Sequence, residues 1–265
     1  MKYLFAMTMY KRPKISELCL LGLERLRKIH DFEILVCGST DDDREVCRGV
    51  DYIHYENLPL GKKNNYLFQT ALEGSFDYLV NLGSDNLASD KLWSEYLTLR
   101  EDYVKPKGIY FFDSVTQRAV NFNPKNTLGA FRMFSRELLE NVGKTYAVTF
   151  RQDVNQFKQG HTYEVKKRLY EYLDKVGVVS LKYETFNIWA EDINNGLDFS
   201  SESRIIENGY TAHIVDFGKT QVIDVKSEAN IWKYEKFTDN PAASKREVFS
   251  LIGEKEIEHL NKIKL

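Results

Sequence analysis

One short segment of the sequence combines residue types that can bind a metal ion. Asp85 and Asn86 follow the apolar run 78–82, and Ser84 precedes them. A carboxylate and an amide at the carboxyl end of a strand can ligate a hard divalent cation, and that cation can bridge two phosphates and neutralise charge on a leaving group. An Asp-Asn pair after a strand is also common in turns and helix caps, so the pair alone leaves both interpretations open.

The elements that must position this pair alternate between strands and helices. Apolar residues at helical spacing follow Pro13 and Gly61, and short apolar runs lie between these segments, at 3–9, 32–37, 51–55 and 78–82. This alternation predicts an α/β fold, Rossmann-like, with a mostly parallel twisted sheet flanked by helices. In such a sheet the functional loops lie at the carboxyl ends of the strands.

The second half of the sequence is less regular. Its patterns predict a charged amphipathic helix over 163–175, a short helix from Ser135, a C-terminal helix that begins with a capping box at Ser244, and four strands at 108–112, 118–122, 211–215 and 221–225. We see no repeat and no low-complexity linker. We therefore place only a soft boundary near residue 125, between 1–125 and 126–265 of one continuous domain.

From Pro59 to Leu97 the sequence resembles the nucleotide-sugar-binding half of GT-A glycosyltransferases, especially those like family two. Gly61, Lys63 and Asn65 match a Gly-x-Lys-x-Asn stretch that opens a helix in that family. The run 83–86 matches the Asp-x-Asp metal motif, with Asp85 at the metal-binding position. The resemblance implies that 1–125 binds a nucleotide sugar and that the less regular 126–265 holds the acceptor.

The metal motif departs from the family pattern at both ends, because Gly83 stands at its first acidic position and Asn86 at its last. The resemblance implies that Asp85, with Asn86, holds Mn²⁺ or Mg²⁺. With fewer protein charges than usual, we expect metal binding that is weaker or more dependent on the donor.

The resemblance extends to the loops after the first two strands. Thr8, Tyr10 and Arg12 lie where the family holds the base, ribose and phosphate, and Ser39 with one of 41–43, for which we take Asp41, lies where an acidic residue reads the base. Other roles fit these residues as well: Tyr10 as an aromatic at the edge of the core, Arg12 as the solvated start of a helix, and 41–43 as a solvated acidic loop.

The resemblance also implies a catalytic base. Asp198 has Arg204, Gly209 and Tyr210 at the offsets that follow the family's acidic residue at a helix start. An inverting transferase needs one carboxylate to take the proton of the acceptor hydroxyl. Asp192, after Glu191, is the rival candidate, although it lies too far from Gly209. Asp198 could instead cap the helix.

Two further residues match the family more loosely. Gly129 lies in a segment where a small residue lets the chain approach the donor sugar and the acceptor; it could equally permit close packing before the helix at Ser135. His213 follows Gly209 and Tyr210 in a predicted strand. Some GT-A enzymes use a late histidine as a metal ligand, whereas a lone histidine in an apolar strand is more often a core residue.

Composition excludes several classes of protein. The 265 residues are 43% hydrophobic and their charges nearly cancel at −2, so there is no global electrostatic footprint for a polyanion. Three cysteines in apolar surroundings argue for a reducing compartment, the cytoplasm, and no apolar run approaches the ~20 residues that span a bilayer. The sequence also lacks a P-loop and a Gly-x-Gly-x-x-Gly turn, which excludes P-loop ATPases and simple NAD enzymes.

We therefore expect a metal-assisted, inverting glycosyltransferase that uses a nucleotide-sugar donor, with a UDP-sugar favoured. The run 222–227 is similar to C-terminal strings of virus-encoded transferases, which makes a hydroxymethylated base in phage DNA one candidate acceptor, in a host cytoplasm, and a glycan the other. The cluster 166–168 would suit a DNA backbone. The alternatives are a degenerate GT-A domain that binds without catalysis and a sugar nucleotidyltransferase, although 8–13 lacks the glycine that the latter needs. The sequence leaves the oligomeric state open.

Overall fold

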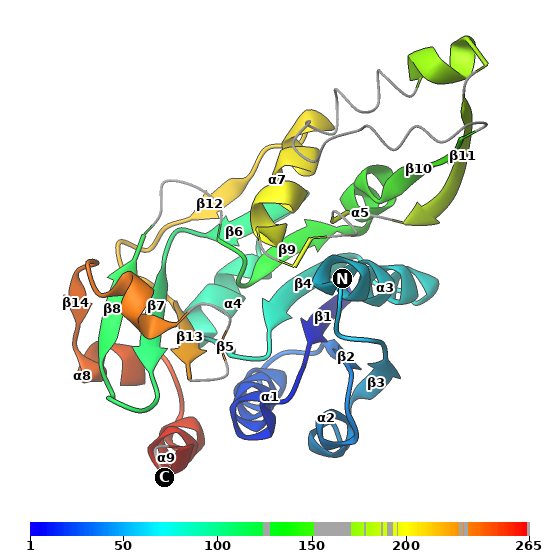
Figure 1. The fold of residues 1–265 in the computed structure, drawn as a ribbon. Helices are drawn as coiled ribbons and strands as arrows, with labels where there is room; N and C mark the ends of the chain where they lie inside the picture. The colour runs from blue at the N-terminus through cyan, green and yellow to red at the C-terminus, as the bar shows by residue number, and fades with distance from the viewer. Residues whose placement is uncertain are drawn as a thin grey trace.

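The first half of the chain alternates strands and helices, as the sequence predicts (Figure 1). The computed structural model describes residues 1–123, 128–150, 171–177, 179–186, 188–189, 193–194, 196–227, 230 and 233–263, and only the backbone of 144–150 and 179–186. The alternating elements are β1 (Tyr3–Thr8), α1 (Pro13–Arg27), β2 (Glu33–Gly38), α2 (Asp41–Val46), β3 (Asp51–His54), α3 (Leu60–Glu73) and β4 (Tyr78–Gly83).

A seven-stranded sheet forms the centre of the molecule. Its order is β12-β6-β9-β4-β1-β2-β3, and β6 (Tyr103–Pro106), β9 (Arg132–Ser135) and β12 (His213–Val215) complete it. The neighbours β1 with β2 and β4, β2 with β3, and β6 with β12 are parallel, whereas β9 runs antiparallel to both β4 and β6. The predicted α/β class, with a mostly parallel sheet flanked by helices, is confirmed.

Helices cover both faces of this sheet because β1 alternates between two cores. Phe5 and Met7 pack with residues of α1 and with Trp93 of α4 (Asp90–Tyr96). Leu4 and Ala6 pack on the other face, with residues of α3, α5 (Arg136–Val142) and α7 (Leu197–Glu207). A strand that is buried on both faces has apolar residues at nearly every position, and for this reason the apolar run 3–9 predicts a strand.

A second sheet lies beside the first and joins distant parts of the chain. Its order is β14-β8-β7-β13-β5, formed by β5 (Asn86–Ala88), β7 (Ile109–Asp113), β8 (Ala119–Phe122), β13 (Val222–Lys226) and β14 (Ala242–Ala243). β13 pairs antiparallel with β5 and parallel with β7. Strands from both sides of residue 125 thus share each sheet; residue 125 itself lies outside the described residues.

The C-terminal elements pack against the second sheet and α1. The 3-10 helix η1 (Tyr234–Phe237) lies beside β7, and α8 (Lys245–Phe249) begins at the predicted capping box of Ser244 and Glu247. α9 (Glu254–Ile263) follows, and its buried Leu260 shares a core with Ile15 of α1. Figure 1 shows α9 near the foot of the molecule, and β10 (Lys144–Phe150) with β11 (Val179–Phe186) as a hairpin that projects from the opposite end.

No helix among the described residues is both long and apolar enough to cross a membrane. The predicted helix over 163–175 lies mostly outside the described residues.

Candidate active site

A cavity of about 570 Å³ opens at the carboxyl ends of β1 and β4. Thr8 ends β1 and Gly83 ends β4, and both line it. The start of α7 forms another part of the wall, and β7, β8 and η1 contribute an apolar part with three phenylalanines, Phe111, Phe122 and Phe237. The position follows from topology, since the loops of parallel strands meet at one edge of the sheet.

Asp85 lies in this wall and is held from behind by Arg12. Nη1 of Arg12 lies 2.6 Å from Oδ2 of Asp85, and Nη2 donates to Ser84 Oγ at 3.0 Å. Asn230 Nδ2 donates to the same Oδ2 at 2.7 Å. Burial alone would raise the pKa of Asp85, but the charges of Arg12 and Lys226 outweigh it and lower that pKa below its usual range. Asp85 is therefore a carboxylate in the cavity wall.

Glycine at position 83 has a steric explanation. A Cβ atom there would lie 2.6 Å from Oδ1 of Asp85 and 3.2 Å from Oδ1 of Asn86. Asn86 Oδ1 also accepts a hydrogen bond of 2.7 Å from the Gly83 N–H, which fixes the turn. A side chain at position 83 would displace the Asp85 carboxylate from the place seen here. Glycine therefore suits the way this loop folds.

A second carboxylate, Asp224, lies next to the Asp85 loop, and we did not choose it as a site residue from the sequence. It pairs in register with Asn86 across β13 and β5, and the next residue, Val225, donates its N–H to the carbonyl of Asp85 at 2.8 Å. Burial first, and the charge of Asp85 second, raise the pKa of Asp224 to about 7. The sequence signal that could have found it is an Asp and a Lys within an apolar strand, because charged side chains are rarely buried in a strand unless they are paired or functional.

Lys226 is the cation that accompanies Asp224. Its Nζ donates to Oδ2 of Asp224 at 2.9 Å, and it lies 4.5 Å from the ring centre of Phe111 and 5.5 Å from that of Phe237. Both Asp224 and Lys226 line the cavity. A buried ammonium between a carboxylate and two aromatic faces has little freedom to move.

Asp198, the predicted catalytic base, lies at the side of the cavity formed by α7. It is in the first turn of α7, whose N-cap is Gly196, so Asp198 does not cap the helix. Its side chain is half exposed, and Oδ1 lies 3.3 Å from Nη2 of the fully buried Arg132. A Cβ atom on Gly129 would lie 2.2 to 2.5 Å from the carboxylate of Asp198. Only glycine at 129 leaves this carboxylate its place.

Lys63 and Asn65 lie in the interior and line no part of the cavity. Lys63 is fully buried and donates to Met9 O at 2.5 Å and to Ser39 Oγ at 2.7 Å, so it ties the loop after β1 to the loop after β2. Burial lowers the pKa of Lys63 to about 8. Asn65 exchanges hydrogen bonds with the backbone of Trp189. In this structure both residues hold loops together.

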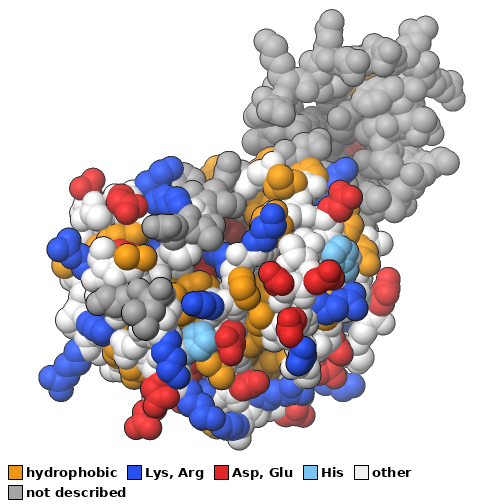
Figure 2. Space-filling model, turned by 60° about the horizontal axis from the view of Figure 1, so that its bottom comes forward, with side chains coloured by type: hydrophobic (Ala, Val, Ile, Leu, Met, Phe, Trp, Pro, Cys, Tyr) orange, Lys and Arg blue, Asp and Glu red, His pale blue; other side chains and the backbone are white. Residues whose placement is uncertain are grey.

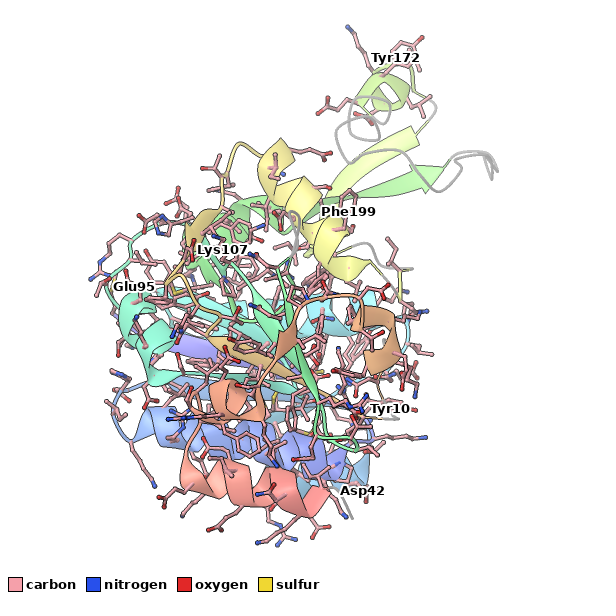
Figure 3. The ribbon with its side chains drawn as sticks, turned by 90° about the vertical axis from the view of Figure 1, so that its left-hand side faces the viewer. Tyr10, Asp42, Glu95, Lys107, Tyr172 and Phe199 are labelled. Atoms are coloured by element: carbon pink, nitrogen blue, oxygen red, sulfur yellow. The ribbon has the colours of Figure 1, made fainter. Side chains whose placement is uncertain are left out.

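The loops expected to hold the base follow β1 and β2, and their predicted residues Tyr10 and Asp41 do not line the cavity. Tyr10 is 37% exposed, after β1, where Lys63 Nζ lies 5.9 Å from its ring centre (Figure 3). Asp41 is exposed in the first turn of α2. The buried member of the acidic run is Asp43, which accepts the backbone N–H groups of Lys11, Ser39 and Thr40 and forms a capping box. Asp43 therefore shapes these loops from inside.

His213, the predicted metal ligand, does not line the cavity. His213 lies in β12 at the far edge of the central sheet, where Nδ1 is 3.7 Å from Glu101 Oε1. It is too remote from Asp85 to share a metal ion with it. Asp192 lies outside the described residues.

The side-chain oxygen atoms in the described part of the cavity wall are of the type that binds a hard divalent cation. Among the lining side chains, Asp85, Asn86 and Asp224 offer oxygen atoms from the β4 loop and the adjacent β13, and oxygen is the ligand type that Mg²⁺ and Mn²⁺ prefer. Oδ1 of Asp224 is buried and accepts no hydrogen bond, although it lies 2.9 Å from the ammonium of Lys226 in their ion pair. Within the described ranges there is no group of three or more His, Cys, Asp or Glu that could hold a metal ion, so oxygens of a bound ligand would have to complete the shell.

Comparison with known proteins adds little beyond the fold. No family model and no curated protein matches the sequence. One similar solved structure is TarS 1–349 of S. aureus, at 11% identity and a TM-score of 0.49, over 85% of this chain and 60% of that one. Another is the mannosyltransferase PcManGT of Pyrobaculum calidifontis with GDP-Man and Mn²⁺, at 14% identity and 0.46, over 89% and 59%. This chain spans about three fifths of each.

Proposed function

We propose that this chain is a glycosyltransferase that moves a sugar from a nucleoside-diphosphate donor to an acceptor hydroxyl. The observation that carries the proposal is the cavity that has Asp85 at the end of β4 on one side and Asp198 at the start of α7 on the other. One carboxylate is thus available for the diphosphate end of a donor and another for the acceptor. A single ligand-sized space joins the two.

In the proposed reaction, Asp198 accepts the proton of the acceptor hydroxyl while the hydroxyl oxygen attacks the anomeric carbon of the donor sugar. The bond from that carbon to the phosphate oxygen breaks, and the diphosphate leaves with the bonding electrons. Arg132 orients Asp198 through their contact of 3.3 Å, and Gly129 leaves room for the carboxylate. A single displacement of this kind inverts the anomeric centre.

The leaving diphosphate needs positive charge. A divalent cation, Mn²⁺ or Mg²⁺, held by Asp85 with Asn86, would neutralise that charge when bound. We retain a UDP-sugar as the first donor to test, and a glycan or a hydroxymethylated DNA base as the acceptor. A cytoplasmic location and a phage origin are predictions from the sequence alone.

The proposal is tested by donor hydrolysis and transfer. The purified protein is incubated with UDP-glucose, UDP-N-acetylglucosamine or GDP-mannose, with Mn²⁺, and release of the nucleoside diphosphate is measured. We expect release with one nucleotide family, and a loss of about a thousandfold in Asp198→Asn, the scale of a missing general base. Asp216→Asn is the matched control, because Asp216 is an exposed partner of Lys107 on a loop away from Asp85.

Other results would favour the alternatives. A nucleotide that raises the melting temperature without any turnover in the presence of acceptor extracts would support a degenerate binding domain. Formation of a sugar nucleotide from a sugar phosphate and a nucleoside triphosphate would support a nucleotidyltransferase. A product that keeps the anomeric configuration of the donor would remove the proposed role of Asp198.

A further inference from the structure

The charges around the cavity nearly balance before any donor enters. Asp85, Asp198, Asp224 and Lys226 line it, while Arg12 and Arg132 reach two of these carboxylates from behind. With all three carboxylates ionised, these described groups carry three negative and three positive charges. A nucleoside-diphosphate donor brings two ionised phosphates, and burying that charge without compensation is costly. A cation must enter with the donor or before it.

The backbone of β13 and β5 fixes where such a cation could bind. Asp224 faces Asn86 in register, and the Val225 N–H binds the Asp85 carbonyl. These pairings bring a carboxylate from residue 224 beside the Asp85 loop, at a sequence separation that no local motif spans. Two strands of one sheet hold both carboxylates, which is a rigid support for a binding site.

The two carboxylates use their oxygens in the same way. Asp85 gives Oδ2 to Arg12 and Asn230, and Oδ1 receives only a contact of 3.4 Å from Asn86 Nδ2. Lys226 Nζ lies 2.9 Å from both oxygens of Asp224, but its hydrogen bond is directed to Oδ2 and the buried Oδ1 accepts none. Each carboxylate thus keeps one oxygen that no hydrogen-bond donor fully satisfies.

We propose that Asp224 is the second carboxylate of the cation site, and that it supplies from β13 the acidic group that Gly83 leaves out of the β4 loop. The inference rests on the proposed function. Asp85 Oδ1, Asp224 Oδ1 and the amide oxygen of Asn86 are the protein ligands, and donor phosphate oxygens complete the shell. Lys226 holds Asp224 in place in the free protein and competes with the divalent cation for it.

The proposal predicts opposite effects for two neighbouring substitutions. Asp224→Asn removes a charged ligand, so we expect Mn²⁺ affinity to fall at least tenfold. Lys226→Met removes the competing ammonium, so we expect Mn²⁺ affinity to rise in the absence of nucleotide. Free Mn²⁺ is measured by electron paramagnetic resonance at increasing protein concentration, with Mn²⁺ alone and then with UDP or GDP. Asp216→Asn is the control, and circular dichroism checks that each variant is folded.

Each outcome bears on one hypothesis. Unchanged Mn²⁺ affinity in folded Asp224→Asn overturns the role of Asp224, and so does nucleotide binding by the wild type that is equally tight in EDTA; in both cases the proposed transferase can still stand. Normal Mn²⁺ binding that depends on Asp224, without nucleotide binding or transfer, supports the cation site and counts against the proposed function.

Discussion

At the residue scale, the closest steric constraint in the site is between Gly129 and Asp198. A methyl group at 129 would overlap the Asp198 carboxylate, which is half exposed and can swing away. We therefore expect Gly129→Ala to lower the transfer rate by about a hundredfold, as misplacing a reacting group by about 1 Å does. The melting temperature should fall as well, because the move takes the carboxylate away from the fully buried Arg132.

The control for this substitution is Gly74→Ala at the end of α3. Gly74 has a negative φ, and an added Cβ would meet nothing closer than the Ala71 carbonyl oxygen at 3.3 Å. Transfer assays and thermal melts of both variants separate the effects. Equal transfer rates in the two variants would show that Asp198 does not need the position seen here.

The second prediction at this scale concerns Lys63 and pH. Its pKa is about 8 in the folded protein and 10.5 in the unfolded chain. Between these values the unfolded chain binds more protons, so the free energy of unfolding rises with pH across this window, by up to about 1.4 kcal/mol per pH unit. Lys63→Met lacks this titration. Denaturant unfolding of both proteins is measured at about pH 8 and about pH 10.5. Between these pH values the free energy of unfolding should rise more in the wild type than in the variant. An equal change in both proteins would contradict the lowered pKa of Lys63.

At the element scale, α9 shows how far a local pattern can mislead. Half of its ten residues are charged, and we did not predict it as a separate helix, yet Leu260 is fully buried against α1 and Arg25 lies 2.5 Å from Glu256. We expect Leu260→Ala to lower the free energy of unfolding by about 2 to 5 kcal/mol, the range for a buried leucine that leaves a cavity. Urea titration measures it, with the exposed Lys262→Ala as control. A change as small as that of Lys262→Ala would place α9 off the core.

The sequence could predict the elements whose signals lie within a few residues, but not those that depend on pairing between distant strands. Continuous apolar runs give β1 and β4, and the capping box gives the start of α8, because each signal lies within a few residues. β9 is inserted between β4 and β6, and β13 between β5 and β7. These insertions depend on pairs such as Tyr103 with Phe134 and Asn86 with Asp224, which are distant in the sequence and leave no local trace. Asp85 and Asp198 could therefore be identified as site residues from sequence motifs. Asp224 could be identified only from the pairing of β13 with β5 in the structure.

At the scale of the whole molecule, charge bears on the choice of acceptor. The formal net charge is −2, and on the face in Figure 2 the described basic and acidic side chains are interspersed. Proteins that bind duplex DNA neutralise many phosphates with clustered Lys and Arg, and their affinity falls steeply with salt. The basic cluster 166–168 lies outside the described residues. The nearby Tyr172 is exposed, far from the central sheet (Figure 3).

We therefore expect binding to unmodified duplex DNA weaker than about 10⁻⁴ M at physiological salt, the weak end of the range for non-specific binding. Fluorescence anisotropy of a labelled duplex at several salt concentrations measures it. Tighter binding with a steep salt slope would favour a modified base as acceptor, and replacing Lys166, Lys167 and Arg168 with Ala should then reduce the slope. Weak binding without salt dependence would favour a glycan, because a neutral acceptor gains nothing from clustered positive charge.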